Sequence, residues 1–123
     1  MEAMRFAADV LAAFAALEHL GFLVLEMFYW TKPIGLRIFR LTPEAARSSA
    51  VLALNQGLYN GFLAAGLAWG LIAADPLALP VKSFFLACMV VAGVVGAATV
   101  SPRVLLVQAG PAALALLLLR LSR

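Results

Sequence analysis

The sequence predicts an all-α integral membrane protein: an antiparallel bundle of four transmembrane helices that forms a single domain over residues 1–123. Composition is the first reason. Hydrophobic residues make up 65% of the chain and charged residues 12%, whereas roughly 25% of an ordinary soluble domain is charged. A chain this short has too little interior to hide that much apolar surface from water. We therefore expect lipid to solvate most of its surface.

Segment length is the second reason. Four apolar segments are each about 18 to 25 residues long, enough to cross a hydrocarbon core of roughly 30 Å. They cover approximately residues 6 (or 10)–30, 50–74, 81–100 and 102–119. The connections between the later segments are short, which favours antiparallel neighbours. Ala13-Phe14-Ala15 resembles a signal-peptidase site, but Asp9 leaves too short an apolar core before it, which favours a retained helix.

The connection over residues 31–49 is predicted to be a short amphipathic, interfacial segment. It is the most basic stretch of the chain, so the positive-inside rule places it in the cytoplasm and both termini outside. Within it, Thr42-Pro43-Glu44 predicts the start of the second membrane helix. Thr42 is the N-cap, Pro43 takes the first helical position, and Glu44 faces the positive end of the helix dipole.

The first predicted helix carries ionisable residues within a lipid-spanning run. At 100° per residue, its polar side chains from Glu18 onward share one arc of about a third of the helix with three of its aromatic residues. That arc holds Glu18, His19, Phe22, Glu26, Tyr29 and Trp30. An ionisable group that faces lipid costs about 2.5–3.5 kcal/mol or more at mid-membrane, so the arc is expected to face the bundle interior or a wet cavity. Glu18, His19 and Glu26 are candidate titrating groups, and the three aromatic residues are candidate lining.

The second predicted helix repeats this pattern. Its polar arc holds Asn55, Gln56, Tyr59 and Asn60. Beside that arc, Gly57 and Gly61 form a strip without side-chain bulk, the spacing that lets membrane helices approach closely. The polar side chains either orient a ligand or only join helices by hydrogen bonds, each worth roughly 0.6–2 kcal/mol. The residues alone leave both interpretations open.

Several classes of function are disfavoured. The net charge of +3 comes from basic residues scattered at helix ends, without the aromatic-basic stripe of a nucleic-acid-binding surface. The only cysteine, Cys88, cannot form an intrachain disulfide. A carboxylate-bridged metal site in a bundle needs Glu-x-x-His motifs on two helices, and this chain has one histidine. We expect no metal, no cofactor and no nucleic acid.

Three stretches resemble a known family. They are Leu-Glu-Met-Phe-Tyr-Trp-Thr at 25–31, Leu-Thr-Pro-Glu at 41–44 after Phe39, and Asn-Gln-Gly-Leu-Tyr-Asn-Gly-Phe at 55–62. They are similar to a family of small bacterial inner-membrane proteins filed as domain of unknown function number thirteen hundred and four. The resemblance covers nearly the whole chain. It implies four membrane helices in a multi-pass protein of the bacterial inner (plasma) membrane, and it supplies no reaction.

The function we expect is binding or transport of a small hydrophobic or amphipathic molecule. Glu26 and His19 would titrate, and the amide and phenol groups of the second helix would orient the ligand. One alternative is a membrane enzyme with isomerase-like acid/base chemistry on a lipophilic substrate, in which Glu26 or Glu18 is the acid/base and His19 its partner. A purely structural subunit is another. The expected partners are membrane lipid and a lipophilic small molecule, and a homo-oligomer stays open.

Overall fold

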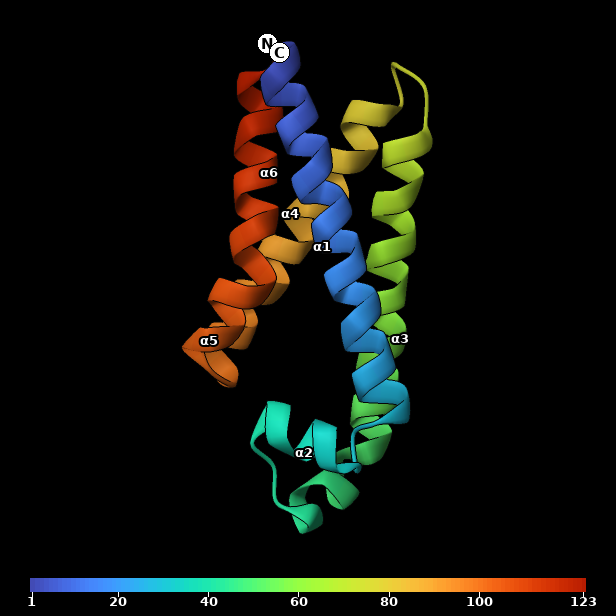
Figure 1. Ribbon diagram of the computed structural model, residues 1–123, viewed down its shortest axis with the longest axis vertical. Coiled ribbons are helices and arrows are strands. Elements are labelled where there is room, and N and C mark those ends of the chain that lie inside the picture. Colours follow the sequence, from blue (N-terminus) through green and yellow to red (C-terminus); the bar gives the residue numbers. More distant parts are fainter. The chain divides into compact units, whose positions relative to one another are not determined.

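The computed structural model describes residues 1–123, except for the side chains of residues 104 and 105. In this described part the chain is all-α, without a β-strand (Figure 1). The elements in chain order are α1 (Glu2–Phe28), α2 (Pro33–Phe39), α3 (Pro43–Ile72), α4 (Ala78–Thr99), α5 (Pro102–Val104), the π-helical turn η1 (Leu105–Ala109) and α6 (Gly110–Leu121). They form two compact units: the first unit is Met1–Glu18 with Leu63–Arg123, and the second unit is His19–Phe62.

Two helices of the described chain are long and apolar enough to cross a membrane, judged by length and composition. They are α1, with 27 residues and a mean hydropathy of 1.8, and α4, with 22 residues and a mean hydropathy of 2.1. A shorter apolar helix covers Leu106–Leu121. The all-α prediction is confirmed, and two candidate spans agree with a membrane protein. The prediction of four spans goes further than this finding.

The core of the first unit consists mainly of small residues. From α1 it takes Ala8, Ala12 and Ala15, whose spacing of four and three residues places them on one helix face. The other members of this core are Ala16, Leu67, Leu86, Met89, Ala112, Ala115 and Leu119. Small side chains on facing helices let the backbones approach closely, as in membrane helix pairs.

The last apolar segment was predicted as one helix over 102–119 and is instead broken. The π-helical turn η1 separates α5 from α6, and Pro111 lies in the first turn of α6. Proline has no N–H, so the carbonyl of Val107 loses its usual partner four residues on, and a π turn accommodates such an interruption. Gly110-Pro111 thus coincides with a break in α-helical geometry.

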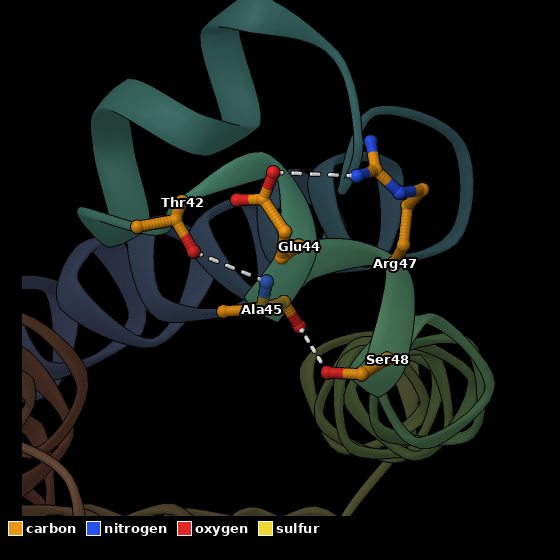
Figure 2. Close-up of polar contacts among 5 residues, drawn as sticks. All are labelled: Thr42, Glu44, Ala45, Arg47 and Ser48. Carbon is orange, nitrogen blue, oxygen red and sulfur yellow. Dashed lines mark hydrogen bonds and ion pairs between the residues drawn. The ribbon is translucent and has the colours of Figure 1, made fainter.

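The start of α3 follows its local sequence, as Figure 2 shows. The backbone N–H of Ala45 donates to Thr42 Oγ1 at 3.1 Å, so Thr42 is the predicted N-cap. Pro43 is the first residue of α3, and Glu44 lies in its first turn. Glu44 also pairs with Arg47 at 3.5 Å, with both side chains largely exposed. The prediction for this helix start is confirmed.

The connection before α3 contains a helix. The first membrane segment was predicted to extend to about residue 30, whereas α1 ends at Phe28 and Pro33 occupies the first turn of the new helix α2. Gly35 in α2 is buried against the end of α1. A Cβ at this position would lie against the carbonyl oxygens of Tyr29 and Trp30. Only glycine therefore lets α2 pack so closely on that backbone.

Candidate functional site

The second unit contains a buried carboxylate that accepts a hydrogen bond from a side chain of α3. Glu26 on α1 is 8% exposed and Asn60 on α3 is 4% exposed. Asn60 Nδ2 donates to Glu26 Oε1 at 2.5 Å. A carboxylate in an apolar helix is costly unless a donor satisfies it, and the amide supplies that donor.

A glycine one turn before Asn60 makes this contact possible. A Cβ at Gly57 would stand 2.7 Å from Met27 Cγ, 3.1 Å from Glu26 Cβ and 3.1 Å from the carbonyl oxygen of Leu23. The helices α1 and α3 therefore meet here at the separation that a missing side chain allows. The Gly57-x-x-Asn60 spacing places the close approach and the amide donor on the same side of α3.

The face of α3 turned toward α1 is the small-residue strip rather than the polar arc. In the second unit the buried residues of α3 are Ala46, Ala53, Gly57 and Asn60, at spacings of seven, four and three residues. Asn60 lies at the edge of both the strip and the polar arc, so the structure brings it to Glu26. Helix packing here follows side-chain volume, because bulky polar groups on the arc would hold the backbones apart.

The other members of the α3 polar arc lie away from Glu26. Asn55, Gln56 and Tyr59 are all exposed. Asn55 Nδ2 donates to the backbone oxygen of Val51 in its own helix at 3.1 Å. The two predicted arcs are thus joined through Asn60, and the ligand-orienting role of the other three residues stays a prediction.

His19 and Phe22 lie one turn apart on α1. His19 is fully buried, and its ring meets that of Phe22 edge-on with centroids 5.4 Å apart. Phe22 is half-buried. Glu18 is the last residue of α1 in the first unit and is partly exposed. Its Oε1 atom is buried, without a hydrogen-bond partner among the described residues.

The aromatic residues at the end of α1 were predicted to line the site. Tyr29 is 45% exposed. Trp30 Nε1 donates to Ser49 Oγ at 3.0 Å, and its ring packs on Phe39 with centroids 4.8 Å apart. Trp30 therefore joins the ends of α1 and α2 to the start of α3.

A second polar contact, which was not predicted from the sequence, lies in the first unit. Lys82 Nζ on α4 donates to Asp9 Oδ1 on α1 at 2.7 Å. Lys82 is 6% exposed, and the Asp9 side chain is 40% exposed. Each is an isolated charge at the edge of an apolar run, and such charges pair with one another within membranes. A comparison of isolated charges on different apolar segments could therefore have predicted the pair.

The chemistry open to these groups is proton exchange and hydrogen bonding. Among the described side chains, no group of three or more His, Cys, Asp or Glu residues is placed to hold a metal ion. Within the second unit, the Glu26 carboxylate and the Asn60 amide form a buried polar contact between α1 and α3. It is the candidate site.

Fold and site define a small helical protein with apolar helices, in which buried polar groups on different helices contact one another. The chain belongs to the family described as "Protein of unknown function (DUF1304)", which matches residues 13–120. The resemblance expected from its sequence motifs is confirmed. The chain is 29% identical over 110 residues to the uncharacterized protein YpaA of Lactococcus lactis subsp. lactis (strain IL1403). The aligned region covers 88% of this chain and 92% of that protein. No solved structure matches the chain.

Proposed function

We propose that this is a multi-pass protein of the bacterial inner (plasma) membrane with four spans: α1, α3, α4 and the α5–η1–α6 segment. Besides α1 and α4, support comes from large apolar side chains exposed on the other two segments. On α3 these include Val51, Leu52 and Phe62, and on the last segment Leu106 and Leu117. Soluble monomers rarely expose contiguous apolar surface on this scale, whereas lipid solvates it at no cost.

Helix length is consistent with this assignment. With 30 residues, α3 extends about 45 Å at 1.5 Å per residue, more than the roughly 30 Å of a hydrocarbon core. Its capped first turn, with Glu44 and Arg47, would then lie among the lipid headgroups. The basic connection that holds α2 would face the cytoplasm, and both termini would lie outside.

Cysteine-accessibility labelling tests this topology. Three spans would separate the α2 connection from the C-terminus, so a single cysteine at Arg40 and one at Arg123, both exposed positions, are expected to be labelled from opposite sides. Cys88→Ala provides the cysteine-free background. Labelling of both positions from the same side would contradict four spans.

For activity, we propose that the protein binds or transports a small hydrophobic or amphipathic molecule and that Glu26 handles its polar group. The observation that carries this proposal is the buried Glu26 carboxylate held by Asn60. Ionisable residues inside membrane helices mark substrate and proton pathways more often than packing. His19, fully buried on the same helix of the second unit, is the second titratable group of the proposed site.

Glu26→Gln separates handling of a ligand from packing. Glutamine keeps the side-chain shape and an oxygen that accepts from Asn60, but it does not titrate between pH 5 and 9. We expect an unchanged melting temperature in detergent, together with a changed set of lipophilic molecules in the organic extract, identified by mass spectrometry. Glu44→Gln, at the exposed start of α3, is the matched control and is expected to leave the extract unchanged.

Two outcomes would contradict the proposal. An extract of Glu26→Gln identical to that of the wild type at every pH of purification would show that the carboxylate does not handle a ligand. A variant that unfolds would show that Glu26 serves as a structural hydrogen-bond partner between α1 and α3.

A further inference from the structure

A second candidate binding site lies in the first unit, apart from the residues proposed for function. The starts of α1 and α4, the end of α3 and the end of α6 surround a hollow of about 600 Å³. Ligand pockets for small molecules usually measure about 300–1,000 Å³, so the size is suitable.

The inner wall of this hollow holds a fixed ammonium group. The Lys82 stem lies on Gly70 of α3, where a Cβ would stand 2.7 Å from Lys82 Cγ and 2.9 Å from its backbone nitrogen. The glycine thus lets α4 approach α3 and directs the long side chain across to Asp9. An ammonium group has three donors, and Asp9 Oδ1 accepts one of them. Two N–H groups are left for a ligand.

Two further charges of opposite sign line the same hollow. They are Arg5 on α1 and Asp75 in the loop after α3, and both are exposed. Neither takes part in an ion pair within the part of the chain that the structure describes. Together with the Lys82–Asp9 pair, the four charges sum to zero. A ligand with a single charge would leave one of the rim charges unmatched, whereas a zwitterion matches both.

The rest of the lining is apolar, with Leu71 at the end of α3, Leu79 at the start of α4 and Leu119 on α6. Hydrocarbon beside paired charges is the lining expected for a molecule with a polar head and an apolar chain. A small polar zwitterion would leave these leucines without a partner.

We propose that this hollow binds a zwitterionic amphiphile, in which an oxyanion such as phosphate contacts Arg5 and Lys82, an ammonium group contacts Asp75, and the hydrocarbon chain packs on the leucines. Charge-assisted hydrogen bonds from guanidinium and ammonium groups suit phosphate oxygens. The same chemistry occurs in a lipid headgroup and in a free zwitterion. The apolar lining favours the lipid.

Native mass spectrometry of the full chain in dodecyl maltoside tests this proposal. The probes are lauroyl lysophosphatidylethanolamine, free phosphoethanolamine and dodecyl phosphate. The neutral detergent has a chain of similar length and provides the background. We expect one saturable site for the lysolipid, at least tenfold tighter than for free phosphoethanolamine. Equal affinities for the lysolipid and for free phosphoethanolamine would contradict the assignment of an amphiphilic ligand. The absence of a saturable site would overturn the whole proposal.

Variants then separate the two charges of the head. Arg5→Gln is expected to weaken the binding of both the lysolipid and dodecyl phosphate by about tenfold. Asp75→Asn is expected to weaken binding of the lysolipid by about tenfold. Binding of dodecyl phosphate is expected to be as tight or tighter, because that probe has no ammonium group. Both residues are exposed, so the fold is expected to persist.

Arg103→Gln is the matched control, since it removes an exposed arginine of the first unit that does not line the hollow. Its binding is expected to equal that of the wild type. Equal losses in Arg103→Gln and Arg5→Gln would reduce the effect to net charge and overturn the site. Glu26 does not line the hollow either. Unchanged lysolipid binding in Glu26→Gln would therefore support a site independent of the proposed function, and its loss would contradict that independence.

Discussion

Replacement of Gly57 by alanine is the sharpest test of how α1 and α3 pack in the second unit. The new Cβ would stand 3.1 Å from Glu26 Cβ and 3.1 Å from the Leu23 carbonyl oxygen, both fixed to the α1 helix. Met27 Cγ, at 2.7 Å, belongs to a flexible side chain and can move. The two fixed contacts can relax only if the helices separate.

Two opposing contributions set the magnitude. Overpacking of a close contact costs about 1–3 kcal/mol. Alanine also gains about 0.8–1 kcal/mol over glycine in a helix interior. Gly21 on α1 isolates the second contribution, because a Cβ there meets nothing within 4 Å. We therefore expect Gly57→Ala to be less stable than Gly21→Ala by about 1–3 kcal/mol, the overpacking cost.

The assay is unfolding of the detergent-solubilised protein in a dodecyl sulfate titration, followed by circular dichroism. Gly61→Ala is expected to fall between the other two variants, since its Cβ would meet only the end of the Leu23 side chain, at 2.6 Å. If Gly57→Ala proves as stable as Gly21→Ala, the close approach of α1 and α3 is wrong. The Glu26–Asn60 contact would then lose its structural basis.

Three further predictions concern charges, caps and the α2 connection. Asp9→Asn leaves the Lys82 ammonium buried without its counter-ion. Loss of one partner of a fully buried pair costs about 3–5 kcal/mol, and because the Asp9 side chain is 40% exposed we expect a smaller loss, about 1–3 kcal/mol, in the same titration. A loss no larger than that of Glu44→Gln, from an exposed pair worth about 0–1 kcal/mol, would contradict the burial of Lys82. Thr42→Ala removes the N-cap of α3 and is expected to lower the free energy of unfolding by about 1 kcal/mol. Thr42→Ser is expected to recover part of this stability, and the absence of any recovery would contradict the cap. Gly35→Ala is expected to expose the α2 connection to limited proteolysis, because its Cβ would lie against the α1 backbone, and an unchanged digestion pattern would contradict that packing.

Local features of this fold were predictable because they depend on neighbouring residues. The Thr42-Pro43-Glu44 start of α3 follows from donor and acceptor groups within one turn, so its geometry is contained in four consecutive residues. The interruption at Gly110-Pro111 follows in the same way from a missing N–H. Helix α2 was described only as an amphipathic segment, because seven residues carry too little periodicity to establish a helix.

The candidate site was only partly predictable, because a helical wheel orders residues by angle and does not say which sector meets a neighbour. Polarity favoured the sector of Asn55 and Tyr59, whereas close packing selected the adjacent strip at Gly57. Asn60 lies between the two sectors, and its polarity alone placed it among the candidate residues. The Lys82–Asp9 pair joins residues 73 positions apart, and a pattern confined to one segment cannot detect such a partner.

The small-residue strip on α3 has a consequence for how the two helices align along their length. Gly57 and Gly61 lie one turn apart and both lack a Cβ, so sliding α3 past α1 by one turn can place a glycine at the close contact again. The Glu26–Asn60 hydrogen bond can form in one alignment alone. Interhelical hydrogen bonds in membranes are worth roughly 0.6–1.7 kcal/mol, which at room temperature corresponds to a population ratio of about 3 to 18. A contact that adds little to stability therefore selects one helix register from the two in which a glycine occupies the close contact.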